Sequence, residues 1–251
     1  MSAPKYAYNA KPKLSANQLA EYLTASPTRR KSIIKDAKFP KTIVVARYVL
    51  AKTAIKKHLT DPVRSHHHFT DAIAALAARR DKQDATSWVQ GDSKMSIEAI
   101  SVFQRASNRL GLGHFTFSPP TTKPIPLEIE GVKISVALDL ICTRADSSGK
   151  THFGGVVLLF SKGEPSKKNR EDRCKVAALM ALQFAEKNLS SLGDVAPKLC
   201  MVIDVIGGEA YFLKGSYKKL LGDIEHSCGE VALVWDTIKP PADYDGPPIK
   251  S

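Results

Sequence analysis

The sequence has few cysteines, no long apolar run and no segment typical of protein export. No stretch approaches the roughly 18 to 20 consecutive apolar residues of a membrane-spanning helix. The opening MSAPKYAYNAKPK lacks the apolar centre of a signal peptide. We therefore expect a cytoplasmic protein that has no membrane partner. The four cysteines lie too far apart for a zinc or redox motif and are expected to be buried thiols: Cys142, Cys174, Cys200 and Cys228.

Familiar cofactor and catalytic motifs are also missing. The sequence contains no Walker-type phosphate loop, dinucleotide fingerprint, HExxH zinc motif or nucleophile elbow. The triplet His66-His67-His68 has no carboxylate or cysteine at ligand spacing, and consecutive residues point in different directions on any regular element. We therefore expect neither a histidine metal site nor an enzyme of these cofactor classes.

Positive charge is abundant and concentrated at one end. Residues 1–90 carry 17 Lys and Arg against 6 Asp and Glu, whereas the remaining 161 residues carry 20 against 19. Such a block favours attraction to a polyanion through counterion release from phosphates, although an anionic membrane surface or an acidic protein would satisfy the same physics. No basic segment carries the exposed apolar face that membrane binding requires, so we interpret the block as a nucleic-acid-binding region.

Helical periodicity dominates residues 14–80. Ser15 is a candidate N-cap for a first helix, and Ser26-Pro27-Thr28 opens a second that ends before Pro40. Further helices are expected over 42–59 and 69–80. The second helix has the densest cationic face and is the first candidate for phosphate contacts, with a solvated helix face as the alternative: Arg29, Arg30, Lys31, Lys35 and Lys38.

From residue 96 onward helices and strands alternate. The pattern predicts an α/β (mixed α+β) fold in which an N-terminal helical region precedes an αβββαβ core and a long C-terminal helix. We expect a basic helical region over 1–90, an α/β domain over 91–240 and a flexible tail over 241–251, with the polar stretch 81–94 as the boundary. The expected core elements are a helix over 96–110, strands over 127–130, 132–143 and 154–161, a helix over 170–189, and strands over 198–208 and 210–214.

This order of elements resembles the core of the PD-(D/E)XK nuclease superfamily over residues 95–206. Asp139 stands where that family has the aspartate of its second strand, although Leu138 replaces the usual proline. Lys162 stands 23 positions later, in the place of the family's lysine, and Glu98 lies on the first helix, where some members have another metal ligand. The resemblance implies catalytic roles for Asp139, Lys162 and Glu98, with Asp139 and Glu98 as ligands of Mg or Mn.

The family's acid-x-lysine triplet, however, reads Phe160-Ser161-Lys162, so a phenylalanine replaces its carboxylate. One hypothesis is an active metal nuclease whose missing carboxylate has moved to another acid: Glu98, Glu128, Glu130 or Glu164. A second is a protein that binds DNA or RNA without cutting it. A third, from another class, is a scaffold whose basic half docks on an acidic protein partner. One carboxylate is a poor site for a hard divalent ion, which favours binding over cleavage.

The residues after the third strand offer a second basic region. Lys162, Lys167, Lys168 and Arg170 precede or begin a helix, whose N-terminal N–H groups also favour phosphate; a solvated loop is the alternative. Asp139 has an alternative role as a paired structural carboxylate. Asp204, in the apolar run MVIDVIGG, is expected to be structural.

Overall fold

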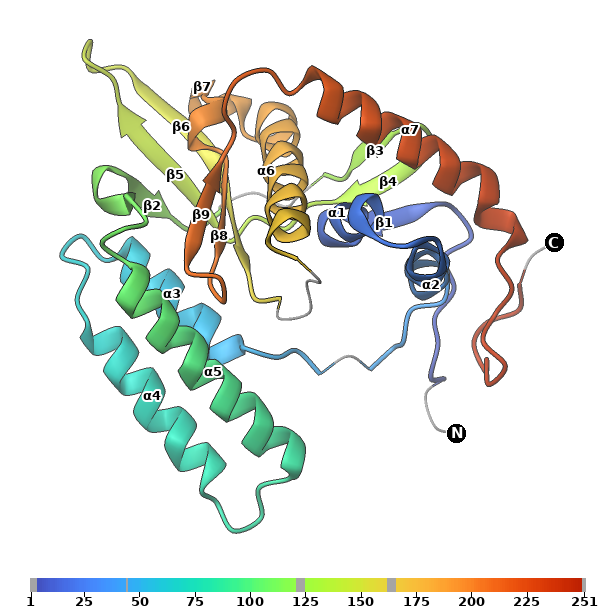
Figure 1. The fold of residues 1–251 in the computed structure, drawn as a ribbon, viewed down its shortest axis with the longest axis horizontal. Helices are drawn as coiled ribbons and strands as arrows, with labels where there is room; N and C mark the ends of the chain where they lie inside the picture. Colours follow the sequence, from blue (N-terminus) through green and yellow to red (C-terminus); the bar gives the residue numbers. More distant parts are fainter. Residues whose placement is uncertain (1–3, 44, 121–124, 162–165, 250–251) are drawn as a thin grey trace.

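The computed structural model describes residues 4–43, 45–120, 125–161 and 166–249, and it shows the expected mixed α/β fold (Figure 1). After one short N-terminal strand, helices dominate the first part of the chain, and further helices separate and follow the later strands. In the described part of the chain, no helix is long and apolar enough to cross a membrane. The helices are α1 (Ala16–Thr24), α2 (Pro27–Lys38), α3 (Val49–Thr60), α4 (His67–Arg80), α5 (Ser87–Ala106), α6 (Lys167–Asn188) and α7 (Lys218–Val234).

The larger sheet carries most of the strands expected in the second half. Its strands follow the order β2, β5, β6, β8 and β9, and β7 also pairs with β6. β5 runs antiparallel to β2 and β6, whereas β6 and β8 are parallel and α6 lies between them in sequence. The carboxyl ends of β6 and β8 therefore lie side by side. The bounds are β2 Thr116–Ser118, β5 Leu140–Ala145, β6 Thr151–Leu159, β7 Asp194–Val195, β8 Met201–Asp204 and β9 Glu209–Phe212.

Helices pack on both faces of this sheet because its central strands are apolar on both sides. In β6, Leu158 packs into a core with α3, α4 and α5, whereas Val157 packs into a core with α1, α6 and α7. In β8, Ile203 packs into the core with α3, α4 and α5, and Val202 packs into the core with α1, α6 and α7. Successive side chains of a strand point to opposite faces, so the continuous apolar runs of these strands produce two helical layers (Figure 1).

The segment 132–143 forms two strands rather than the single expected one. β4 (Val132–Ser135) belongs to a second sheet, between β1 (Lys13–Ser15) and β3 (Leu127–Ile129), whereas β5 starts only at Leu140. Residues 136–139 carry the backbone from one sheet to the other. The apolar alternation continues across this break, so the sequence pattern does not mark it.

The first two helices begin as expected. Ser15 and Gln18 form a capping box at α1, and the Ser26 hydroxyl accepts a hydrogen bond from the Arg29 backbone N–H at the start of α2. Thr86 caps α5 in the same way, so the polar stretch 81–94 is partly helical.

The helix expected over 42–59 is shorter than predicted, because α3 begins only at Val49. Before it, the Thr42 backbone N–H donates to the Lys5 carbonyl at 2.9 Å, and Lys41 forms an isolated antiparallel bridge with Tyr6. β-branched residues such as Ile43 favour helices weakly, so these contacts with the N-terminal segment prevail over helix extension.

Residues before and after position 90 share one core. Apolar side chains of α1 and α2, including Leu19 and Ile33, belong to the same cluster as those of α6 and α7. The tail also has contacts: Asp245 Oδ1 accepts from the Lys5 backbone N–H at 2.8 Å, and the Tyr244 ring lies 5.2 Å from that of Phe39. The two ends of the chain consequently lie on the same side of the molecule (Figure 1).

Candidate nucleic-acid interface

Asp139 lies at the bend before β5 and is fixed by three contacts with its surroundings. Its backbone N–H donates to the Val156 carbonyl at 2.8 Å, and its Oδ2 accepts from the Leu158 backbone N–H at 2.8 Å. Its Oδ1 lies 2.6 Å from Nζ of Lys52, which reaches it from α3. The carboxylate is buried, and both of its oxygens have a partner within the fold.

Phe160, the residue that stands where the predicted resemblance would place a second acid, forms an aromatic contact. Phe160 follows β6, and its ring stacks on Tyr48 with the centroids 5.1 Å apart. The next residue, Ser161, accepts a hydrogen bond at its carbonyl oxygen from Arg170 Nη2 at 2.9 Å. Lys162 and Glu164 lie outside the described residues. Among the described residues that directly follow β6, Phe160 and Ser161 therefore contact an aromatic ring and a guanidinium group.

The described residues do not form a site that fits a divalent ion. Glu98 lies on the exposed side of α5, while Glu128 and Glu130 belong to the hairpin of the smaller sheet. No three His, Cys, Asp or Glu residues in the described ranges are grouped as a metal site. Magnesium and manganese need several oxygen ligands, and Asp139 already binds an ammonium group.

Arg170 and Asp204 form an internal pair at the carboxyl end of β8. Asp204 is fully buried, and both of its oxygens lie within 2.8 Å of Arg170 Nη1. The Gly207 backbone N–H donates a further hydrogen bond to Oδ1 at 2.9 Å. The guanidinium of Arg170 therefore balances a buried charge. Lys167 and Lys168, one turn earlier, are exposed, and Lys167 lies 3.4 Å from Glu209.

Three of the five cations expected on α2 are committed to internal contacts. Arg29 lies 2.7 Å from Glu21, and this hydrogen bond raises the pKa of Arg29. Arg30 donates to the Tyr22 carbonyl at 3.0 Å and lies 3.7 Å from Glu230. Lys38 is buried, and its Nζ donates to the carbonyl of Trp235 at 2.8 Å.

Lys31 and Lys35 remain at the surface of α2 with no ion pair to another described residue.

Helix α3 carries cationic groups that the sequence did not single out as a site. Its charged side chains are Lys52, Lys56 and Lys57, with no acid among them, and Arg47 precedes the helix. Lys52 and Lys56 are one turn apart and therefore share a face. Lys56 and Lys57 have no ion pair within the described ranges, whereas Lys52 is held by Asp139. The sequence signal for α3 is a helix whose charged residues are all positive, whereas the higher density of cations directs the sequence prediction to α2.

Other nucleophilic or metal-binding groups are engaged in packing. All four cysteines are buried and free of disulfides, and burial raises the pKa of Cys142 and of Cys200 to about 12. His67 Nδ1 lies 2.6 Å from Ser65 Oγ, and His68 Nε2 lies 3.0 Å from Asp61. The cysteines are therefore the buried thiols expected from the sequence, and the two histidines are held by neighbouring side chains.

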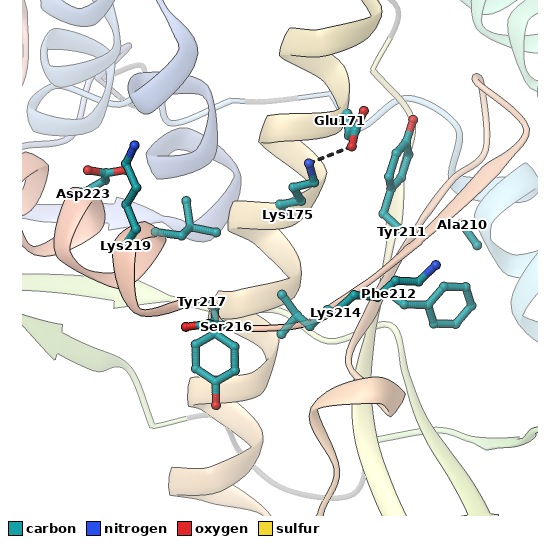
Figure 2. A pocket seen from close by; sticks show the side chains of 12 residues that line it. Glu171, Lys175, Ala210, Tyr211, Phe212, Lys214, Ser216, Tyr217, Lys219 and Asp223 are labelled. Atoms are coloured by element: carbon teal, nitrogen blue, oxygen red, sulfur yellow. Dashed lines mark ion pairs between the residues drawn. The ribbon is translucent and has the colours of Figure 1, made fainter.

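A pocket of about 460 Å³ lies between α6, β9 and the start of α7 (Figure 2). Lys175 within it pairs with Glu171 at 2.7 Å. The rings of Tyr211 and Tyr217 point in opposite directions and do not form a common stacking surface (Figure 2). Because its lining includes acids of α6 and α7 as well as lysines, this pocket does not single out a polyanion.

Comparisons with known proteins identify no family for this chain. No protein-family model matches the sequence, and no curated protein matches it. The resemblance to the PD-(D/E)XK superfamily stays a prediction from the sequence.

Proposed function

We propose that this protein binds nucleic acid through the phosphate backbone and does not cleave it. The observation that carries the proposal is the Lys52–Asp139 ion pair. In the position that the nuclease resemblance assigns to a metal ligand, an ammonium group from α3 neutralises the carboxylate. A lysine can satisfy this buried charge, but it cannot activate a water molecule as a divalent metal does.

The cations of α3 supply the binding surface. Lys56 and Lys57 follow Lys52 along the helix, and Arg47 lies before its first residue. The half-buried Lys56 and the exposed Lys57 have no ion pair to another described residue. Such lysines attract phosphates, because binding releases the counterions condensed on the nucleic acid. Such contacts position a strand without reading its bases, so we assign no sequence preference.

A matched pair of charge reversals tests this surface. Labelled single- and double-stranded DNA and RNA are titrated by fluorescence anisotropy with wild type, Lys56→Glu/Lys57→Glu and Lys218→Glu/Lys219→Glu. The control pair is exposed at the start of α7 and changes the net charge equally. We expect the α3 variant to weaken binding at least about tenfold. It should also reduce the slope of log affinity against log salt concentration by an amount that corresponds to about two phosphate contacts. The control variant should have a much smaller effect.

Equal weakening by both variants would assign the affinity to net charge, and absence of binding at low salt would favour the scaffold function. Incubation of the same nucleic acids with manganese or EDTA tests the second half of the proposal. We expect no metal-dependent cleavage by wild type. Cleavage that disappears in Asp139→Asn would establish an active nuclease and overturn the non-catalytic assignment.

A further inference from the structure

A separate groove lies between α2 and the end of α7, on surfaces that the proposed nucleic-acid site does not use. Its volume is about 670 Å³. Its apolar lining residues include Tyr22 of α1 and the buried Ile34 of α2, together with Leu233 and Val234 of α7 and Ile238 beyond it. Leu233 is 83% exposed and Val234 is 37% exposed, so two large apolar side chains of α7 face water at this point.

Lys38 connects α2 to the segment that follows α7. Its Nζ donates to the Trp235 carbonyl at 2.8 Å and to the Ile238 carbonyl at 3.3 Å, which ties the last residue of α2 to the segment after α7. Lys38 is 3% exposed, so its ammonium lies inside the fold rather than in the groove. The groove is therefore preformed and does not need a partner to assemble it.

The rim of the groove is cationic. Lys31, Lys35 and Lys239 line it without an ion pair to any other described residue. Glu230 is the one acid among the described lining residues, and it is held by Arg30 at 3.7 Å and His226 at 3.4 Å. A ligand in the groove consequently meets apolar side chains beside lysines that have no ion pair to another described residue.

We propose that this groove, the α2–α7 groove, binds an acidic amphipathic helix of a partner protein. The apolar face of such a helix would cover Leu233, Val234 and the half-buried Ile238, while its carboxylates would meet Lys31, Lys35 and Lys239. A second copy of the chain fits less well, since it would bring one cationic rim against another. The acidic residues of the chain's own tail lie elsewhere, where Asp243 and Asp245 contact Tyr6 and Lys5.

The test uses a fluorescein-labelled synthetic helix with leucines on one face and glutamates on the other. Two control peptides have the same composition in scrambled order or lysines in place of the glutamates. We expect saturable binding of the first peptide alone, weakened at least about tenfold by Leu233→Asp and by Lys31→Glu/Lys35→Glu. Val63→Asp is the matched control for Leu233→Asp, because Val63 is 81% exposed and lies outside the groove.

Several results would overturn the proposal. Absence of saturable peptide binding, equal binding of the scrambled peptide, or equal effects of Leu233→Asp and Val63→Asp would each do so. Loss of a dimer in light scattering on Leu233→Asp would assign the groove to self-association. Loss of binding to anionic vesicles in Leu233→Asp would assign the groove to a lipid surface. If wild type binds no peptide and Lys31→Glu/Lys35→Glu loses nucleic-acid binding, the groove belongs to the nucleic-acid site.

Discussion

At the scale of single residues, lysines of similar appearance in the sequence have different roles. Lys38 is buried and donates to backbone carbonyls, Lys52 neutralises a buried carboxylate, and Lys56 remains at the surface. Burial removes water from an ammonium or carboxylate group, so a buried charge must find a partner within the protein. Charge density along the chain therefore does not measure the charge that a ligand meets.

Lys52→Met tests the structural part of this difference. Among the described residues, the substitution leaves the buried Asp139 carboxylate with the Leu158 N–H as its one partner. We expect a loss of about 1 to 2 kcal/mol in the free energy of unfolding, because Lys52 is partly exposed and water replaces some of the interaction. Urea denaturation measures it, with Lys56→Met as the control. The double variant Lys52→Met/Asp139→Asn should lose less stability than the sum of the two single variants. If the changes in unfolding free energy are strictly additive, Lys52 and Asp139 do not interact.

At the scale of elements, close backbone contacts constrain positions that the sequence pattern treats as ordinary. Gly154 lies in β6 opposite η3 (Pro197–Leu199), the short 3-10 helix that leads into β8. A Cβ atom at Gly154 would lie 2.5 Å from the Leu199 carbonyl oxygen and 2.7 Å from the Cys200 backbone nitrogen. Neither backbone atom can move as a flexible side chain does, so this glycine is required by the approach of two segments.

Gly154→Ala should therefore lower the free energy of unfolding by about 2 to 4 kcal/mol, as overpacking of a close backbone contact does. Gly229→Ala is the control, because Gly229 lies within α7 and a Cβ atom there meets nothing within 4 Å. That substitution should instead stabilise the protein by up to about 1 kcal/mol, since alanine favours a helix over glycine. Equal losses for both variants in urea denaturation would contradict the assigned contact.

At the scale of the whole molecule, the fold brings distant segments into two cores with the larger sheet between them. One core joins α1 and α2 to α6 and α7, and the other joins α3, α4 and α5 to the opposite face. His58 lies in the second core, with its ring 4.4 Å from that of Phe69 and its Nδ1 3.1 Å from the Ser65 carbonyl oxygen. Burial lowers the pKa of His58, with nearby Arg64 and His66 acting in the same direction.

This lowered pKa predicts a loss of stability in mild acid. The unfolded chain binds a proton at a histidine near about pH 6.5, whereas folded His58 resists protonation, so the unfolding free energy decreases as the pH falls below that value. We expect the thermal midpoint of unfolding to decrease as the pH is lowered from about 7 to about 5. The variant His58→Gln should reduce this dependence on pH. Exposed His114→Gln is the control. An unchanged pH dependence in His58→Gln would exclude this origin.

Much of the fold followed from local pattern. The caps at Ser15 and Ser26, the apolar run before Asp204 and the buried α6 depend on neighbouring residues, and local rules describe them. The start of α3 and the division of 132–143 did not follow. Both depend on contacts with remote strands or loops, which no local periodicity contains.

The sequence by itself determined that the chain forms mixed helices and strands and that its first ninety residues are basic. Only the tertiary structure decided which cations remain for a ligand. Packing brings partners to Arg29, Arg30, Lys38 and Arg170, whereas Lys56 and Lys57 form no ion pair with another residue that the structure describes. The physical reason is that charge is fixed by residue type, but its neutralisation depends on which groups lie within a few ångströms in space.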